Sequence, residues 1–486
     1  MSCFRKIFGV NNFINLELQT DYMNLNQWCV KQEKIGNNLA KEYFNMEVGL
    51  KFSKANIAKL EKKNIKQNEY FLKNFEKPVE LYWASVGEVA GSKTYKLSLR
   101  LKEERNKKIS NKKHKVNWST WRQWSFKAND KERKEVFDDF IKKTPLISRL
   151  IKDKFDKATK IYSQYELNPL QTYLDEHRIS LNKLISVIKD LKDNTKANFL
   201  RQWKKYSYEI LGREQQYYDD MYFMRNFIFA KIKLKNLDSL KIVKNTIEGM
   251  GFDFNMIKVD DANRKGKYPS PFCSGVKIPD DVRVSFKAEN PINDLNSIHH
   301  EFGHAIHFIS IDKKLPYWSK YIISNGLCET FSTFLEDFIQ DKTYLMEEAK
   351  IDEETSEEIV ARLSFIRDYA TVFYCANSLF RIDYWRKNLN FEDCNKYYAD
   401  KIKECMNIEI PGAYWQLHHI LPESLMYVPS YLLAMKRADE LRNKMKKEYG
   451  NVFWRNKEAG RYLKSVMKPG SKSELGIFSN LGNAFN

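Results

Sequence analysis

The chain has 486 residues, of which 43% are apolar and 14% aromatic, so it is long enough to bury a large core and should fold as a soluble protein. Its formal charge of +19 is spread along the chain, which argues against a nucleic-acid-binding patch. The seven cysteines are scattered without a CxxC pair and no uncharged run of eighteen apolar residues occurs, so we predict no disulfide framework, no membrane span and a reducing, cytoplasmic setting.

The N-terminal part shows mostly helical spacing. Apolar residues recur with a helical period over residues 24–77. Residues 79–102 carry β-branched and aromatic side chains around an Ala-Gly-Ser break, and this pattern predicts a hairpin. The basic run at residues 105–115 has no interleaved aromatic residues and predicts an exposed loop or a hairpin tip. Helical spacing then returns at residues 130–194 and continues over residues 196–232.

The pattern changes in the middle of the chain. Residues 266–275, GKYPSPFCSG, predict a loop, and residues 282–290 begin with a short strand, VRVSF. After Pro291 the chain is helical almost to its end. The fold class is therefore mainly α, with a small β element next to the helix that follows. We divide the chain into an N-terminal helical region with a hairpin, residues 1–195, and a catalytic helical region, residues 196–486.

Residues 297–308, SIHHEFGHAIHF, contain four of the eight histidines of the chain. His300, Glu301 and His304 form an HExxH motif. Residues four apart project from one face of a helix, so the two imidazoles can bind one ion while Glu301 points at a water on that ion. Zinc suits this geometry, since its catalytic sites keep an open position for water. We predict one Zn2+ ion with His300 and His304 as ligands and Glu301 as general base.

The rest of this helix supports that orientation. An apolar stripe on the opposite face can pack into the core; it consists of Leu295, Ile298, Phe302, Ala305 and Ile309. His299 points towards another face and is not expected to bind metal. His307 lies a turn beyond the ligands, and we expect it to line the cleft or to lie in the core.

A third ligand is available 25 residues after His304. Glu329 lies in the segment NGLCETFSTFLEDF, where its apolar neighbours can pack inward. A glutamate on a second helix that crosses the first completes a site of two histidines and one glutamate. Glu336 is on the same face and either accepts a hydrogen bond from the outer nitrogen of a zinc-bound histidine or is solvated.

Residues 264–308 resemble the segment that leads into the zinc helix of the oligoendopeptidase F and thimet oligopeptidase family, with a basic Gly-Lys loop, a short strand and HExGHxxH. The stretch ETFSTFLED, residues 329–337, is similar to that family's Glu-x-x-Ser-Thr-x-x-Glu. The resemblance implies a helical ellipsoid with a deep central channel that admits short unfolded peptides. Residues 266–274 are then expected to line the cleft.

The same resemblance implies a histidine and two tyrosines that bind substrate and stabilise the tetrahedral intermediate. The candidates lie in HHILPESLMYVPSYLLA, where Tyr427 and Tyr431 are four residues apart. Phenol groups near the metal would hold the developing oxyanion. The interval from His419 to Tyr427 is longer than in the family, so whether His418 or His419 faces the substrate stays open, with His419 preferred.

These observations predict a zinc-dependent oligopeptidase, an endopeptidase acting on short peptides, without a nucleic-acid or membrane partner and with a monomer favoured. The alternative within enzymes is a zinc metallocarboxypeptidase of similar helical fold, because residues 280–286 and YVPSY at residues 427–431 resemble the carboxypeptidase Taq family. A third alternative is a non-catalytic basic binding protein with a structural metal site. The predicted site has only three protein ligands, which argues against a structural role because structural zinc usually has four.

Overall fold

The fold is described here from a computed structural model. The described residues are 10–473 without 108, 112, 113, 126, 220–222, 224–231, 233, 235, 236, 269, 289, 290, 418, 419 and 423. Side chains are described from residue 24, without those of residues 110, 111, 114, 115, 119, 122 and 123. Helices account for 72% of the structure, which confirms the mainly α fold class. The deep channel stays a prediction.

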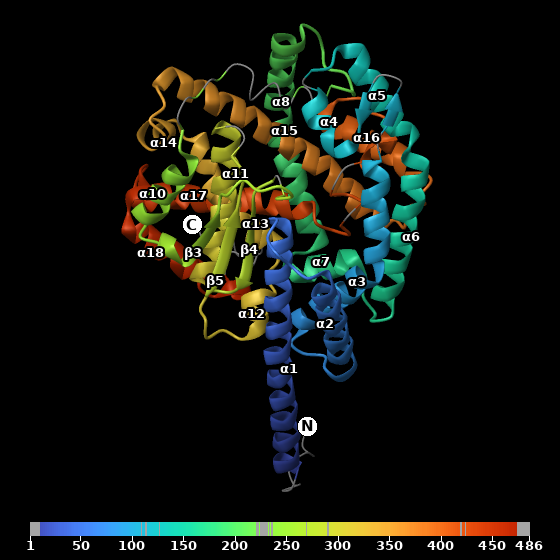
Figure 1. The fold of residues 1–486 in the computed structure, drawn as a ribbon, viewed down its shortest axis with the longest axis vertical. Helices are drawn as coiled ribbons and strands as arrows, with labels where there is room; N and C mark the ends of the chain where they lie inside the picture. The colour runs from blue at the N-terminus through green and yellow to red at the C-terminus, as the bar shows by residue number, and fades with distance from the viewer. Residues whose placement is uncertain are drawn as a thin grey trace, which may run out of the picture.

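Three long helices begin the fold: α1 (Val10–Glu47), α2 (Lys54–Asn74) and α3 (Val79–Asn106). In Figure 1, α1 extends well beyond the rest of the molecule. The hairpin predicted at residues 79–102 is wrong, because this segment is the continuous helix α3. Its buried side chains follow a helical period, with Val86, Val89 and Ala90 on one face. Packing of that face outweighs the strand preference of the valines.

A hairpin does follow α3, at the basic run. Strands β1 (Ile109–Asn111) and β2 (His114–Val116) pair antiparallel, which confirms the prediction of a hairpin tip there. Five helices come next: α4 (Trp118–Ser125), α5 (Asp130–Lys142), α6 (Thr144–Ser163), α7 (Pro169–Glu176) and α8 (Leu181–Leu211).

Helix α8 runs through the boundary predicted between residues 195 and 196, and the division into two regions stays a prediction. The helix predicted over residues 196–232 is wrong at residues 212–219, which are not helical, and most of its remainder lies outside the described residues. Gly212 ends α8 with a φ of 69°, a left-handed conformation that glycine adopts without a steric cost. Helix α10 (Ser239–Gly249) leads to the sheet.

The small sheet has three strands: β3 (Ile257–Asp260), β4 (Phe272–Lys277) and β5 (Asp281–Ser285). Central strand β5 pairs parallel with β3 and antiparallel with β4. The strand predicted in VRVSF is confirmed. The loop predicted at residues 266–275 is wrong from Phe272 onward, because these residues pair with β5. Helix α11 (Pro291–Ser310) packs against β4 and β5, so the β element lies next to the histidine helix, as predicted (Figure 1).

The C-terminal part is helical. Its helices are α12 (Tyr317–Tyr321), α13 (Asn325–Glu336), α14 (Lys342–Glu347), α15 (Glu353–Arg386), α16 (Cys394–Met406), α17 (Pro429–Tyr449) and α18 (Lys457–Met467). Short 3-10 helices are η1 (Phe254–Met256), η2 (Asp337–Gln340), η3 (Gly412–Gln416), η4 (Phe453–Arg455) and η5 (Gly470–Lys472). Helix α13 packs between α11 and α17, and α18 also packs against α11.

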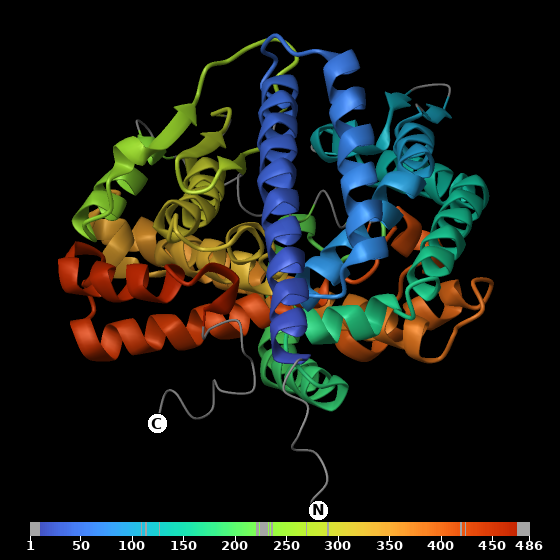
Figure 2. The same cartoon turned by 90° about the horizontal axis from the view of Figure 1, so that it is seen from below.

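One large hydrophobic core extends from Leu101 to Met467. One smaller cluster joins α1, α2 and α3, and another joins α3 to α6. Figure 2 shows α1 crossing in front of the helical body, with α2 and α3 beside it. None of the helices in the described part of the chain has the length and apolar character needed to cross a membrane.

Candidate metal centre

The site depends on the close crossing of α11 and α13. Gly303, inside the HEFGH motif, lies at the crossing point. A Cβ atom added there would lie 2.4 Å from the Phe331 carbonyl oxygen and 2.5 Å from Ser332 Cα. Only glycine therefore allows the two helices to approach this closely. The predicted apolar stripe of α11 is buried, which turns the opposite face towards α13.

The crossing brings the three predicted metal ligands together. One ligand atom from each of His300, His304 and Glu329 lies within 4.8 Å of the other two. Glu329 Oε2 is 3.5 Å from His300 Nε2 and 3.8 Å from His304 Nε2. An ion bound at about 2.0–2.2 Å from each atom fits such a triangle. The donor set of two imidazoles and a carboxylate suits zinc, and it leaves one tetrahedral position open.

Glu336 fixes the orientation of the first ligand. His300 Nδ1 donates a hydrogen bond to Glu336 Oε2 at 2.7 Å, so of the two alternatives for Glu336 the structure shows the contact with the outer nitrogen. Asn296 Nδ2 donates to the other carboxylate oxygen at 2.8 Å. This arrangement leaves His300 Nε2 as the nitrogen that faces the other two ligands, as expected for a metal-binding histidine with a carboxylate partner.

The third ligand is also held in place. Tyr427 donates to Glu329 Oε1 at 2.5 Å, and Ser332 Oγ donates to Glu329 Oε2 at 3.2 Å. The Glu329 side chain is buried, with 6% exposed. A buried carboxylate needs such partners. Tyr431, the second predicted tyrosine, has its ring 5.2 Å from the ring of Tyr427 and stacks on Tyr374.

Protonation differs between the two histidines. In His304 burial dominates and lowers the pKa to about 4. In His300 burial also favours the neutral form, but the hydrogen bond and charge of Glu336 outweigh it and raise the pKa to about 10. A metal binds the neutral imidazole, so binding at this site releases a proton from His300.

Glu301 lies beside the ligands with a perturbed carboxyl group. Burial is the main cause that raises its pKa to about 7, and the charge of Glu329 acts in the same direction, while His300 opposes it. The Cys273 main chain donates a hydrogen bond to the carboxylate from β4. A carboxyl group that titrates near neutral pH can both accept and return a proton.

The structure adds a residue that sequence reasoning missed. His177, at the end of α7, is fully buried, and its Nε2 accepts a hydrogen bond from the Gly326 N–H in the first turn of α13 at 3.2 Å. Its Nδ1 donates to the Tyr173 carbonyl at 2.9 Å, and Ser430 on α17 lies 3.4 Å from Nε2. His177 is 152 positions before Glu329, and no motif or spacing connects them.

The other two histidines of the cluster lie outside the group of His300, His304 and Glu329. His299 is buried, donates to the Leu295 carbonyl and accepts from Tyr344, which confirms the prediction. His307 is a core residue whose ring lies 4.4 Å from the ring of Phe331. His418 and His419 lie outside the described residues.

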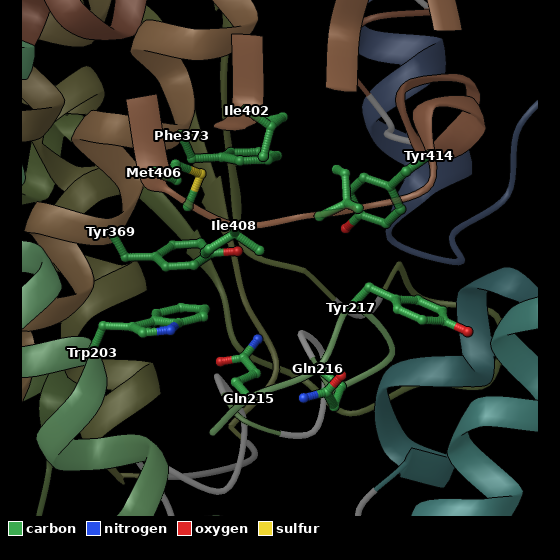
Figure 3. Close-up of a pocket in the computed structure, with 11 residues that line it drawn as sticks. Trp203, Gln215, Gln216, Tyr217, Tyr369, Phe373, Ile402, Met406, Ile408 and Tyr414 are labelled. Atoms are coloured by element: carbon green, nitrogen blue, oxygen red, sulfur yellow. The ribbon is translucent and has the colours of Figure 1, made fainter. Parts of the chain in front are cut away.

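A separate pocket lies between α8, α15 and α16, away from these ligands (Figure 3). Its walls are mainly aromatic and apolar, with Trp203, Tyr369 and Phe373 along one side. Its volume of about 30 Å³ has room for little more than water. None of the residues that line it belongs to the metal centre.

Comparison with known proteins identifies the family. The profile of the carboxypeptidase Taq (M32) metallopeptidases matches residues 31–384. The fold is similar to Trypanosoma cruzi metallocarboxypeptidase 1, with a TM-score of 0.63, 16% identity, and coverage of 96% of this chain and 97% of that chain. It is also similar to an M32 carboxypeptidase from Deinococcus radiodurans R1, with a TM-score of 0.58, 12% identity and coverage of 96% of each chain. No curated protein sequence matches the chain.

These matches correct the resemblance to the oligoendopeptidase F and thimet oligopeptidase family, which is wrong. An HExxH motif followed by a glutamate on a second helix is common to both groups of helical enzymes, so the ligands do not separate them. Two segments resemble the carboxypeptidase Taq family, as the alternative prediction states. They are residues 280–286, which contain β5, and residues 427–431. The match covers most of the sequence, and the chain belongs to the carboxypeptidase Taq (M32) family of metallopeptidases.

Proposed function

We propose that the protein is a zinc-dependent carboxypeptidase that removes residues from the C-terminal end of peptides. The observation that carries the proposal is the ligand triangle of His300, His304 and Glu329 beside Glu301, in a chain that belongs to a metallopeptidase family. The similar structures from Trypanosoma cruzi and Deinococcus radiodurans are named as carboxypeptidases, which supports exopeptidase action here.

A zinc ion held by the three ligands would polarise the scissile carbonyl and lower the pKa of a water molecule. Glu301 is the general base in this proposal. Its pKa of about 7 allows it to take a proton from water at neutral pH and to return that proton to the leaving amine. The hydrogen bond from the Cys273 main chain keeps the carboxylate of Glu301 in one orientation during both transfers.

The two tyrosines serve as hydrogen-bond donors. Burial, followed by nearby groups that include the Glu329 carboxylate, raises the pKa of both Tyr427 and Tyr431, so both phenols stay protonated at neutral pH. Tyr427 donates to Glu329, which supports a role in positioning this ligand. Tyr431 is then the better candidate for stabilising the oxyanion. The role of His419 in binding substrate stays a prediction.

Short peptides are the expected substrates of this carboxypeptidase.

The free thiols of the six described cysteines support a cytoplasmic location.

Product analysis by mass spectrometry tests the proposal. A peptide with a free C-terminal carboxylate should lose residues stepwise from that end. The same peptide with its C-terminus blocked as an amide should remain intact. A chelator should stop the reaction, and added zinc should restore it. The Glu301→Gln protein, purified in the same way, controls for a contaminating peptidase. Internal cleavage of the amidated peptide by the parent protein, absent from this control, would contradict the proposal.

A further inference from the structure

Two adjoining cavities lie among α1, α2 and α3, the blue part of the ribbon in Figures 1 and 2. Helix α12 contributes Tyr317 and Tyr321 to the lining of the first cavity. The volumes of the two cavities are about 330 Å³ and 370 Å³, within the range of ligand sites, roughly 300–1,000 Å³. Four residues line both cavities: Leu39, Tyr43, Asn64 and Glu88. No metal ligand lines either one.

The charge of the lining is negative. Glu88 lies where the two cavities meet, and Glu61 lines the second cavity. Asn64 Nδ2 donates to Glu88 Oε2 at 2.9 Å, and Tyr43 donates to Glu61. None of the described residues that line the cavities is a lysine or an arginine, in a chain with a charge of +19. The Glu88 side chain is exposed in these cavities, and none of the described residues forms an ion pair with it.

Two buried polar atoms at the first cavity lack a partner. Ser85 is 1% exposed and its Oγ has no hydrogen bond, and the same holds for Oε1 of Gln32, which is 5% exposed. Gln32 Nε2 donates to Asn64 Oδ1 at 2.6 Å, so the amide orientation is fixed. A buried polar group without a partner costs about 1–3 kcal/mol. Both atoms are almost fully enclosed by protein, so a ligand in the cavity would reach them only if the cavity wall shifted.

Glycines keep the helix faces open. Gly36 of α1 lines the first cavity and Gly91 of α3 lines the second. A Cβ atom added at either position would meet no atom within 4 Å. Glycine inside a helix is about 1 kcal/mol less favourable than alanine. Close helix packing does not require glycine at these two positions. The missing side chains instead leave space for the cavities.

Aromatic rings complete the first cavity, among them Trp28, Tyr317 and Tyr321. The faces of such rings offer apolar surface against which an aliphatic chain can pack. We propose that the cavities bind an organic cation, an ammonium or guanidinium group on an aliphatic chain, with the charged group at Glu88 and the chain against the rings. One source of such a group is a lysine or arginine side chain of a peptide substrate, and this source rests on the proposed function. The other source is a free alkylamine.

Calorimetric titration of the full-length protein with n-pentylamine and with n-pentanol tests the site, because the two probes differ mainly in charge. The amine should bind at least about 10-fold more tightly than the alcohol, as expected when a charged group meets a carboxylate. Glu88→Gln should abolish this preference. Glu103→Gln, which removes an exposed charge from the same helix, should retain it. Equal binding of the two probes, no amine binding, or unchanged amine preference in Glu88→Gln would overturn the proposal.

A second variant separates the site from the stability of the fold. Gly36→Leu fills the first cavity with a better helix former, so the melting temperature should stay or rise while amine binding is lost. Retained amine affinity in this folded variant would also overturn the proposal.

Kinetics then distinguish the two sources. If the peptide supplies the cation, peptides with an internal lysine should have a lower KM than their norleucine counterparts, and pentylamine should compete with them. Amine binding without competition assigns the site to a free amine. Because binding is measured without turnover, absence of peptidase activity would sink the proposed function and leave the cation site standing.

Discussion

His300 Nδ1 donates to Glu336 Oε2 at 2.7 Å, and this bond joins the two helices that carry the ligands. The outer carboxylate raises the basicity of the imidazole and fixes its ring. Glu336→Gln preserves the size of the side chain but removes the charge. We expect zinc affinity to fall by roughly 10- to 100-fold, measured by competition with a chelating dye.

The exposed Glu354 of α15 offers a matched control, since Glu354→Gln removes a charge outside the site. Its zinc affinity should equal that of the parent protein. Equal affinity in the Glu336→Gln protein would show that this bond does not tune the metal site.

Glu301→Gln should separate metal binding from turnover. Glutamine cannot accept the proton, so kcat should fall by roughly 10²- to 10⁴-fold. The metal content by mass spectrometry should remain that of the parent, because Glu301 is not among the three ligands. His304→Ala should instead lose the metal. Parent-like turnover in Glu301→Gln would remove this residue from the mechanism.

His177 should matter for stability through α13. Replacing it by phenylalanine keeps the ring but leaves the buried Gly326 N–H without an acceptor. The free energy of unfolding should fall by about 1–3 kcal/mol, measured by urea denaturation. His177→Gln retains an acceptor oxygen and should lose less. If the phenylalanine protein is as stable as the parent, His177 does not hold the start of α13.

His307 should make stability depend on pH. Burial lowers its pKa from 6.5 to about 3, and neither ring nitrogen has a hydrogen-bond partner among the described residues. Between about pH 6.5 and pH 3 the unfolded chain therefore binds a proton that the folded chain does not. The free energy of unfolding should fall as the pH drops through this window.

The variant His307→Phe removes this contribution and can stack on Phe331. Near pH 5 the unfolding free energy of this variant should depend less steeply on pH than that of the parent protein. The two slopes should differ by up to about 1.4 kcal/mol per pH unit. Identical slopes for the two proteins from urea melts at several pH values would contradict a neutral buried His307.

The sequence was most informative where one helix carried the signal. The HExxH spacing and the apolar stripe of α11 depend only on helix geometry, so the histidine face could be predicted. Glu329 could be proposed from its polar face on a second helix. The contact between His300 and Glu336 was one of two alternatives, because the crossing that Gly303 permits is a tertiary feature.

The failures also have physical reasons. Residues 79–102 looked like a hairpin because valines and a glycine suggest strands, yet their burial follows a helical period in α3. Residues 272–275 form part of β4 because β5 supplies a pairing partner, which no local pattern shows. The role of His177 and the cavity at Glu88 arise from contacts between distant helices.

Anomalous diffraction at the zinc absorption edge, from crystals of the zinc-loaded protein, tests the central claim most directly. The account predicts one strong peak about 2.0–2.2 Å from His300 Nε2, His304 Nε2 and a carboxylate oxygen of Glu329. A peak elsewhere, or a zinc ion coordinated without Glu329, would contradict it.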